Sequence, residues 1–368
     1  MAAARAATLA AAPAGGTARQ IAHRRLLQTQ RAAAWHLDAA VVFDIDGVLV
    51  RGQQTIDEAR GALRMLAGDN RLGLRIPFAL LTNGGGVSEA AKAEQLSRKL
   101  DAQISADQII LAHSPMKALA RTYADKHVLI AGGPGRQCAE IARSYGFANV
   151  STPDDVVAWQ PAAWPFMELS DAERARARPR DFARHPFAAV MLFHDSFNFG
   201  RDLQVITDVL RSQDARLGAP FADRQSAALY MSNADLVFSN EYARPRLAQG
   251  AFHVCLQAMW DALTNRAPLQ YTRYGKPFAV QYQYAERLLD EFARQHGQAR
   301  PGARRVYAVG DNPAADIAGA NAAGWTSVLV RTGVFSGAND ATHPAAMVVD
   351  HVGEAVARII DAEHRLIK

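Results

Sequence analysis

Cysteine is scarce in this sequence of 368 residues, which contains only Cys138 and Cys255. Two cysteines can form at most one bridge, so the disulfide frameworks of small secreted domains are excluded. They do not form a C-x-x-C pair, and no histidine lies at zinc-ligand spacing from either. Both are therefore predicted to be small buried hydrophobic residues.

Long apolar runs are absent as well. Apolar residues make up 49% of the chain, enough for a sizeable core. No uninterrupted run approaches the roughly 20 residues that a membrane-spanning helix needs. The length exceeds that of one ordinary core and fits two domains. We therefore expect a soluble chain without a transmembrane segment, peripheral to a membrane at most.

Acidic residues are missing from the first 37 positions, which hold five arginines. Beyond them the chain has 36 basic and 36 acidic residues, so a neutral body gives no reason to expect nucleic-acid binding. A segment rich in alanine and arginine and free of acids is typical of a transit peptide. We predict a transit peptide over residues 1–37. A secretory signal and a tail without an address remain alternatives.

Short apolar runs alternate with longer amphipathic stretches along the rest of the chain. The runs lie at 41–45, 78–81, 128–131, 188–193, 306–309, 327–330 and 347–349. The helical stretches include 57–67, 88–100, 202–212, 278–296 and 353–364. Continuous apolar character suits buried parallel strands, and the alternation predicts an open α/β sheet. Residues 158–186, with five arginines, break this rhythm and are predicted to be a solvated face or an inserted loop, with an anion site as the alternative.

The strongest motif is the string VVFDIDGVLV at 41–50. An apolar strand ends in Asp44 and Asp46, and residues two apart on a strand face the same side. Gly47 allows a sharp turn directly after them. Sites in open α/β sheets form at the carboxyl ends of strands, so both carboxylates are predicted to serve one site.

Three further motifs follow. The run at 78–81 ends in Thr82, Asn83 and three glycines, whose hydroxyl and backbone amides could hold phosphate oxygens. Lys276 precedes a helical stretch and offers a point charge to a phosphate. The run at 306–309 leads into Asp311, and Asp316 follows five residues later. Carboxylates so placed suit Mg²⁺, which takes oxygen ligands.

In this order the four motifs resemble those of the haloacid dehalogenase superfamily. Only 38 positions separate Asp44 from Thr82, whereas 194 separate Thr82 from Lys276. A cap domain fits in the second interval, which is similar to the class II cap, subclass A. The resemblance implies an α/β fold with a Rossmann-like parallel-sheet core over 38–112 and 272–368. The α/β class II cap is expected over 113–271.

Several strings resemble the cat eye syndrome critical region protein 5 family, also called haloacid dehalogenase-like hydrolase domain-containing 5. They are AGGPGR at 131–136, SYGF at 144–147, DLQ at 202–204, SNADL at 232–236 and QGAF at 249–252. Members are often mitochondrial, which implies a mitochondrial location, with the matrix expected. Some relatives carry an appended phosphatidyltransferase domain, hence a family-level link to glycerophospholipid synthesis.

The resemblance implies a Mg²⁺-dependent phosphatase that works through an aspartyl-phosphate. Asp44 is the implied nucleophile, and Asp46 the implied general acid and base. The implied phosphate-binding residues are Thr82, Asn83 and Lys276. The implied magnesium ligands are Asp44, Asp46 (through its carbonyl), Asp311 and Asp316. Two departures from the common pattern, Gly84 after Asn83 and the absence of a threonine before Asp316, remove no catalytic group.

Substrate selection is expected to fall to the cap, with Asn233 and Asp235 as candidates. An Asx-type turn explains the same string equally well. The expected partner is a small phosphorylated substrate, and the oligomeric state stays open, a homodimer included.

Three other functions are known or conceivable for a protein with these motifs. A dehalogenase is disfavoured because Asp46 supplies an acid that carbon–halogen cleavage does not need. A mutase is disfavoured because its usual cap position, before Thr82, is empty. A catalytically weak or idle binding protein that acts through its cap remains the alternative.

Overall fold

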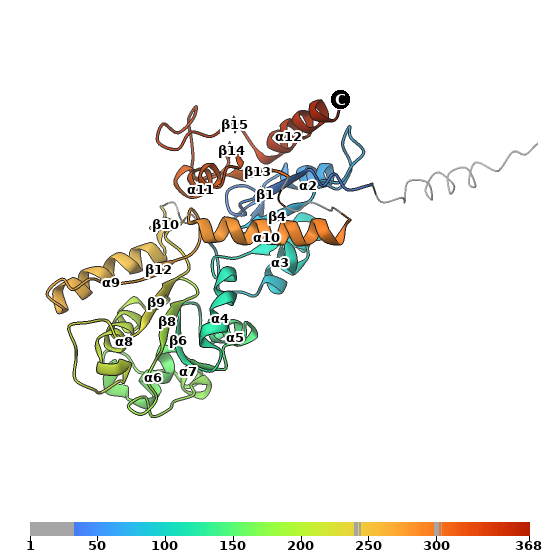
Figure 1. Ribbon diagram of the computed structural model, residues 1–368. Helices are drawn as coiled ribbons and strands as arrows, with labels where there is room; N and C mark the ends of the chain where they lie inside the picture. Colours follow the sequence, from blue (N-terminus) through green and yellow to red (C-terminus); the bar gives the residue numbers. More distant parts are fainter. Residues whose placement is uncertain (1–32, 239–241, 243, 298–301, 303) are drawn as a thin grey trace, which may run out of the picture. The chain divides into compact units, whose positions relative to one another are not determined.

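Two parallel sheets hold most of the strands in the computed structural model (Figure 1). The structure describes residues 33–368 except 239–241, 243, 298–301 and 303. The predicted transit peptide therefore lies almost entirely outside the described residues. Residues 35–368 form one compact unit. Within the described part of the chain, no helix is both long and apolar enough to cross a membrane.

The first sheet has six parallel strands. In spatial order they are β15 (Met347–Val349), β14 (Thr326–Val330), β13 (Arg305–Gly310), β1 (Ala39–Phe43), β4 (Phe78–Leu81) and β5 (Ile109–Ile110). All five residues of β1 are buried. Strands of a parallel sheet are covered on both faces, which explains why the predicted runs are continuously apolar.

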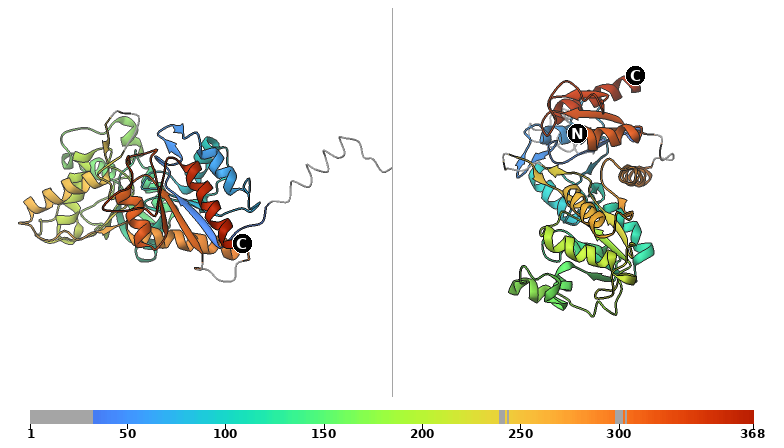
Figure 2. Two further views of the ribbon diagram at one scale, coloured as in Figure 1. Left: turned by 90° about the horizontal axis from the view of Figure 1, so that it is seen from above. Right: turned by 90° about the vertical axis from the view of Figure 1, so that its left-hand side faces the viewer.

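Helices cover both faces of this sheet (Figures 1 and 2). Val41 and Phe43 of β1 pack in one core with α2 (Ala59–Leu66), α3 (Glu89–Leu100) and α12 (Val352–Ile367). Ala40 and Val42 point to the other face and pack with α10 (Ala279–Gln295) and α11 (Ala318–Ala322). Side chains of a strand alternate between faces, so one short apolar run supplies two cores. The predicted Rossmann-like parallel-sheet core is confirmed.

The second sheet has five parallel strands. In spatial order they are β12 (Thr272–Arg273), β9 (Ala228–Met231), β8 (Ala189–Leu192), β6 (His127–Ala131) and β7 (Asn149–Ser151). One face packs against α6 (Pro153–Trp159), α8 (Phe199–Arg211) and α9 (Gln249–Leu263), and the other against α5 (Gln137–Ser144). Short elements complete the fold: α4 (Ala120–Tyr123), α7 (Asp171–Arg176), and the hairpins β2 (Val50–Arg51) with β3 (Gln54–Thr55) and β10 (Val237–Phe238) with β11 (Arg246–Leu247).

The second sheet comes from the interval between Thr82 and Lys276 where the sequence predicted a cap. Thr272 and Arg273, which the prediction assigned to the core, pair with β9 in the second sheet. The boundaries at 112/113 and 271/272 therefore stay a proposal. Residues 158–186 hold the end of α6, the six-residue α7 and otherwise irregular, largely exposed chain.

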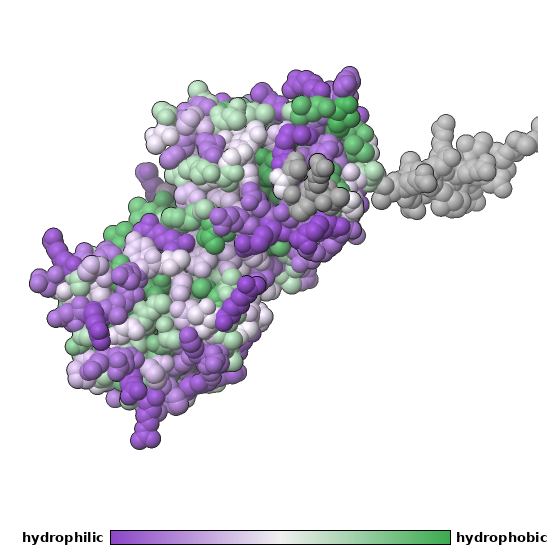
Figure 3. Space-filling view, viewed as in Figure 1, coloured by the Kyte–Doolittle hydropathy of each residue, from purple (hydrophilic) through white to green (hydrophobic). Residues whose placement is uncertain are grey.

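The prediction that both cysteines are buried is wrong for Cys255. Cys138 is buried on α5, whereas Cys255 lies on the exposed side of α9. Phe252, Leu256 and Trp260 pack α9 against the second sheet, and residue 255 falls on the opposite side of the helix. Composition alone does not reveal which side of a helix faces a sheet. Figure 3 shows apolar side chains at the surface where β10 meets α9.

The buried carboxylate of Glu363, near the C-terminal end of the compact unit, contacts His36, near its N-terminal end. Glu363 of α12 accepts hydrogen bonds from Arg305 (2.5 and 2.8 Å) and from the Tyr307 hydroxyl (2.7 Å). Nε2 of His36 lies 2.7 Å from the same carboxylate. Burial raises the pKa of Glu363, but the hydrogen bonds from its partners lower it by more, to about 2.

We expect Glu363→Gln to lower the free energy of unfolding at pH 7 by about 2 kcal/mol, because the buried carboxylate loses charged hydrogen bonds although its partner Arg305 is half-exposed to water. A lowered pKa stabilises the fold above the unfolded value of 4.5, and this contribution is lost as the pH falls toward about 2. Urea unfolding between pH 3 and pH 7 measures the effect. The variant should lose less stability on acidification than the wild type; equal losses would contradict the prediction.

Candidate active site

The site lies at the carboxyl edge of the first sheet. Asp44 follows β1, Thr82 follows β4 and Asp311 follows β13, and β1 lies between the other two strands. The Asp44 N–H donates to the Val309 carbonyl (2.8 Å), which continues the β1–β13 ladder into the site. Parallel strands end at the same edge, so side chains that are 38 and 267 positions from Asp44 in the sequence meet here.

Three carboxylates converge at this edge. Asp44, Asp311 and Asp316 are buried, and each offers an oxygen within 4.8 Å of the others. One oxygen of Asp316 accepts the N–H groups of Asp311 (3.1 Å) and Asn312 (2.9 Å), which holds the loop after β13 against the following turn.

Lys276 lies within this group. Its Nζ is 2.5 Å from a carboxylate oxygen of Asp44 and 2.5 Å from one of Asp316. The side chain is buried, so it donates to these carboxylates rather than to water. Burial lowers the pKa of Lys276, but Asp316 and Asp44 raise it by more, and the amine remains an ammonium ion.

One ammonium ion cannot neutralise three carboxylates. Burial raises the pKa of Asp44 well above its usual value, Lys276 lowers it, and the neighbouring carboxylates raise it again. Burial and Asp316 raise the pKa of Asp311 to about 7. This excess of buried negative charge, presented by oxygen atoms, fits a divalent cation that prefers oxygen ligands, as Mg²⁺ does.

Two glycines leave room for Asp311. A Cβ at Gly47 would lie 2.4 Å from an oxygen of Asp311, and one at Gly333 would lie 1.8 Å from it. The same oxygen accepts the Val334 N–H at 2.7 Å. The loop after β14 thus fixes the carboxylate, and the Thr332 hydroxyl donates to the Gly47 carbonyl across the site (2.5 Å).

We expect Gly333→Ala to weaken Mg²⁺ binding by about 10- to 100-fold, the usual effect of disturbing a group that orients a ligand. The added Cβ must displace Asp311 from the Val334 N–H. Calorimetric Mg²⁺ titration measures this directly. Gly61→Ala is the matched control, because a Cβ there meets only the Arg64 side chain at 3.9 Å. Equal affinity in both variants would contradict the prediction.

The Thr82 and Asn83 side chains differ in their hydrogen-bond partners. The buried Thr82 hydroxyl accepts the Gly84 N–H (2.9 Å) and keeps its own proton to donate. Asn83 is engaged by the protein: its oxygen accepts the Lys276 N–H (2.6 Å), and its nitrogen donates to the Lys276 carbonyl (3.1 Å) and to Asp235 (3.0 Å). In this arrangement Asn83 positions Lys276, and its predicted contact with phosphate stays a prediction.

Asp46 differs from the three buried carboxylates. Its side chain is exposed and does not belong to the described three-carboxylate group. It is nevertheless close enough for its charge to raise the pKa of Asp44. The exposed Asp46 carboxylate is therefore open to water beside the buried Asp44.

The loop after β9 joins the second sheet to the site. Asn233 accepts the Asp235 N–H (2.8 Å), which is the Asx turn that the sequence left open. The Asp235 carboxylate also accepts a hydrogen bond from the Asn83 side chain. Asn83 therefore links the loop after β9 to the carboxyl edge of the first sheet. The roles of Asn233 and Asp235 in substrate selection remain predictions.

Two contributions to the site were not predicted from the sequence: residues 332–334 and the hydrogen bonds of Gln249. The first group follows β14, and its position at the carboxyl end of a predicted strand was the available signal. Gln249 accepts the Asn233 N–H (2.9 Å) and donates to the Ser232 hydroxyl (3.1 Å). It begins α9 in the QGAF string, which indicated a family resemblance but not a contact with the loop after β9.

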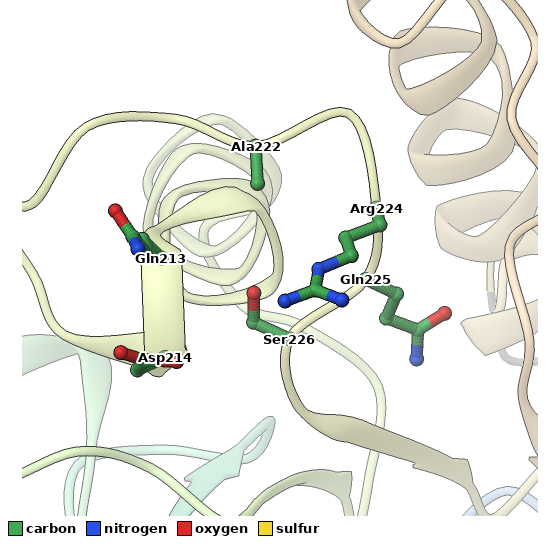
Figure 4. A pocket seen from close by; sticks show the side chains of 6 residues that line it. All are labelled: Gln213, Asp214, Ala222, Arg224, Gln225 and Ser226. Atoms are coloured by element: carbon green, nitrogen blue, oxygen red, sulfur yellow. The ribbon is translucent and has the colours of Figure 1, made fainter.

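A cavity of about 280 Å³ lies elsewhere (Figure 4). Its lining residues are Gln213, Asp214, Ala222, Arg224, Gln225 and Ser226. They precede β9 and lie toward its amino end, whereas Asp235 follows the carboxyl end. Sites in open α/β sheets form at the carboxyl ends of strands, so this cavity is not the candidate active site.

Comparison with known proteins agrees with this arrangement. Residues 41–148 match the haloacid dehalogenase-like hydrolase family model, and residues 273–355 match the HAD-hydrolase-like model. The chain is 36% identical to a mitochondrial hydrolase of Saccharomyces cerevisiae over 88% of this chain and 95% of that protein. The chain belongs to the haloacid dehalogenase-like hydrolases and is an enzyme of the hydrolase class.

Two further similarities extend this result. A cardiolipin synthase (CMP-forming) / mitochondrial hydrolase fusion protein of Schizosaccharomyces pombe is 39% identical over 87% of this chain. This chain spans 52% of that protein, about half its length. A glycerol phosphate phosphatase of Mycobacterium tuberculosis, solved with magnesium, has a TM-score of 0.54 and 18% identity, over 85% of this chain and 75% of that one. At that identity the similarity shows the fold alone.

Proposed function

We propose that this protein hydrolyses a small, water-soluble phosphate monoester with Asp44 as the nucleophile. The observation that carries the proposal is the position of Lys276, with Nζ 2.5 Å from both Asp44 and Asp316 in a group of three buried carboxylates. A carboxylate that must attack an anion needs positive charge beside it. The lysine supplies one charge, and Mg²⁺ held by Asp44, Asp311 and Asp316 would supply two more.

The residues divide the chemistry between them. An Asp44 oxygen attacks phosphorus and forms an acyl phosphate, while the ester oxygen leaves with a proton from Asp46. Asp46 then takes a proton from water, which attacks phosphorus and releases phosphate and the Asp44 carboxylate. Thr82 donates its hydroxyl to a transferring oxygen, and Lys276 balances the charge of the others.

A small substrate follows from the contact between the two sheet-bearing parts. The Asp235–Asn83 hydrogen bond bridges the loop after β9 and the catalytic edge, which limits the space above Asp44. Closure of this kind excludes water and large substrates. Asn233 and Asp235 would then select the alcohol portion of the substrate.

Location and pathway extend the proposal. Both relatives are named mitochondrial hydrolases, and one is fused to a cardiolipin synthase. We propose that the enzyme is located in the mitochondrial matrix, with residues 1–37 as the transit peptide and a substrate from glycerophospholipid metabolism.

A reporter fused to residues 1–37 should enter mitochondria. The same fusion with its five arginines replaced by glutamine should stay in the cytosol.

The central experiment compares kcat/KM for glycerol phosphates, sugar phosphates, a phosphopeptide and micellar phosphatidylglycerol phosphate, each with Mg²⁺ and with chelator. Turnover of small esters that requires Mg²⁺ is expected. A preference for the micellar lipid would overturn the small-substrate assignment. Equal rates in excess chelator would overturn the metal assignment, and no turnover at all would favour a binding protein.

We expect Asp46→Asn to lower kcat by about 10²- to 10⁴-fold, the usual contribution of general acid–base catalysis. Esters with good leaving groups, such as aryl phosphates, should lose less because their oxygen leaves without a proton. Steady-state rates for an aryl and an alkyl phosphate give the comparison. Asp57→Asn, another exposed carboxylate nearby in the sequence, is the control. Equal losses with both esters would remove Asp46 from this role.

A further inference from the structure

Helix α9 exposes an apolar side. It has no lysine or arginine and a single acidic residue, Asp261, and its other side packs into the second core through Phe252, Leu256 and Trp260. Every exposed residue of the helix is apolar: Val254, Cys255, Ala258, Met259, Ala262 and Leu263. A helix that is apolar on both sides is normally buried on both sides.

The hairpin beside α9 extends this surface. Both β10 and β11 pack against α9, and Leu236, Val237, Phe238 and Leu247 are 44–62% exposed. Leu236 and Val254 line one cavity of about 140 Å³ between the loop and the helix, so the hairpin and helix surfaces are continuous. We call the six exposed residues of α9 and these four hairpin residues the α9 face.

The size of the α9 face matches a protein interface. Its seven largest side chains are 37–62% exposed, so together the face presents on the order of several hundred Å² of apolar surface. Soluble monomers rarely expose contiguous apolar patches above a few hundred Å². A standard stable interface buries about 800 Å² on each partner.

We propose that the α9 face is the interface of a homodimer in which α9 packs against α9 of a second copy. The ten residues of the α9 face are uncharged, and the exposed Arg246 of β11 and the half-buried Asp261 lie at its margin, so a second apolar surface of similar size covers it better than a charged peptide does. A twofold axis supplies such a surface from the same residues. Small Ala258 and Ala262 alternate with larger Met259 and Leu263, which allows antiparallel helices to interdigitate.

A membrane surface is the other class of apolar partner, and the chemistry of α9 disfavours it. Helices that lie in a lipid interface carry lysine or arginine on their polar side. Helix α9 has neither residue.

The interface would support the catalytic site. Gln249, the first residue of α9, hydrogen-bonds Ser232 and Asn233, and the Gly250 N–H donates to the Asp235 carbonyl (2.8 Å). Asp235 in turn contacts Asn83. Packing of α9 against a second copy therefore fixes the base of the loop that reaches the site, and dissociation should raise KM more than it lowers kcat.

The first test is the solution mass of the full chain by sedimentation equilibrium at micromolar concentration. The wild type should have twice the 39.9 kDa chain mass. Met259→Glu should be a monomer whose unfolding temperature does not depend on protein concentration, whereas that of the wild type should rise with concentration. Leu366→Glu, which places the same charge at an exposed apolar position of α12, should remain a dimer. A monomeric wild type, or a dimeric Met259→Glu, would overturn the proposal.

Cys255 gives a second readout that needs no variant. It lies on the α9 face, whereas Cys138 is buried and serves as the internal reference. Maleimide labelling of Cys255, followed by peptide mass spectrometry, should be slower by about tenfold or more at micromolar than at nanomolar protein, because dilution dissociates the dimer. Concentration-independent labelling would overturn the proposal. Flotation of monomeric protein with phosphatidylcholine–phosphatidylglycerol vesicles would also overturn it and assign the face to lipid.

Discussion

Asp44→Asn is expected to abolish turnover, with a loss on the order of 10⁴-fold or more, while the fold remains intact. The amide has nearly the same size as the carboxylate but cannot attack phosphorus. One of three mutually repelling buried carboxylates is also removed, so the unfolding temperature of the metal-free protein should not fall. Steady-state kinetics with an aryl phosphate and a thermal unfolding scan measure both effects.

Comparing the activity of Asp44→Asn with that of Asp46→Asn separates the nucleophile from the general acid. An aryl phosphate needs little protonation, so Asp46→Asn should keep measurable activity with it while Asp44→Asn has none. Comparable residual activity in the two variants would show that Asp44 is not the nucleophile. A fall in unfolding temperature for Asp44→Asn alone would show that its charge stabilises the fold, contrary to the repulsion described here.

Lys276→Met should have the largest combined effect on activity and stability. The methionine fills a similar volume but leaves Asp44, Asp311 and Asp316 without a cation. Breaking a buried ion pair by removing one partner costs about 3–5 kcal/mol. Urea unfolding in chelator at pH 7 should show this loss, and turnover should fall because phosphate binding loses its lysine.

Three comparisons test whether the stability that Lys276→Met loses comes from its unneutralised carboxylates. Mg²⁺ should restore part of the stability of Lys276→Met, because it neutralises the same carboxylates. Lowering the pH from 8 to 6 should do so as well: burial and Asp316 raise the pKa of Asp311 to about 7 in the wild type, and the loss of Lys276 raises this pKa further, so Asp311 takes up a proton as the pH falls. Arg71→Met, which breaks an exposed ion pair with Asp361, should cost about 1 kcal/mol or less. Equal losses for Arg71→Met and Lys276→Met would refute the charge argument.

The sheet class and the candidate residues could be predicted from the sequence. Continuous apolar runs predicted β1, β4, β13 and β14, because strands buried on both faces cannot alternate. The acids and hydroxyls that follow these strands were found by position alone. Local patterns suffice here because each motif is a strand end, a feature that a few consecutive residues encode.

The contacts between motifs were decided only by the tertiary structure. The sheet order puts β13 beside β1, and a loop far along the chain brings Lys276 between Asp44 and Asp316. The same packing gave Asn83 a structural partner in the Lys276 backbone and turned Cys255 to the exposed side of α9. These outcomes depend on which surfaces meet between elements that are tens to hundreds of residues apart, and no short stretch of sequence contains that information.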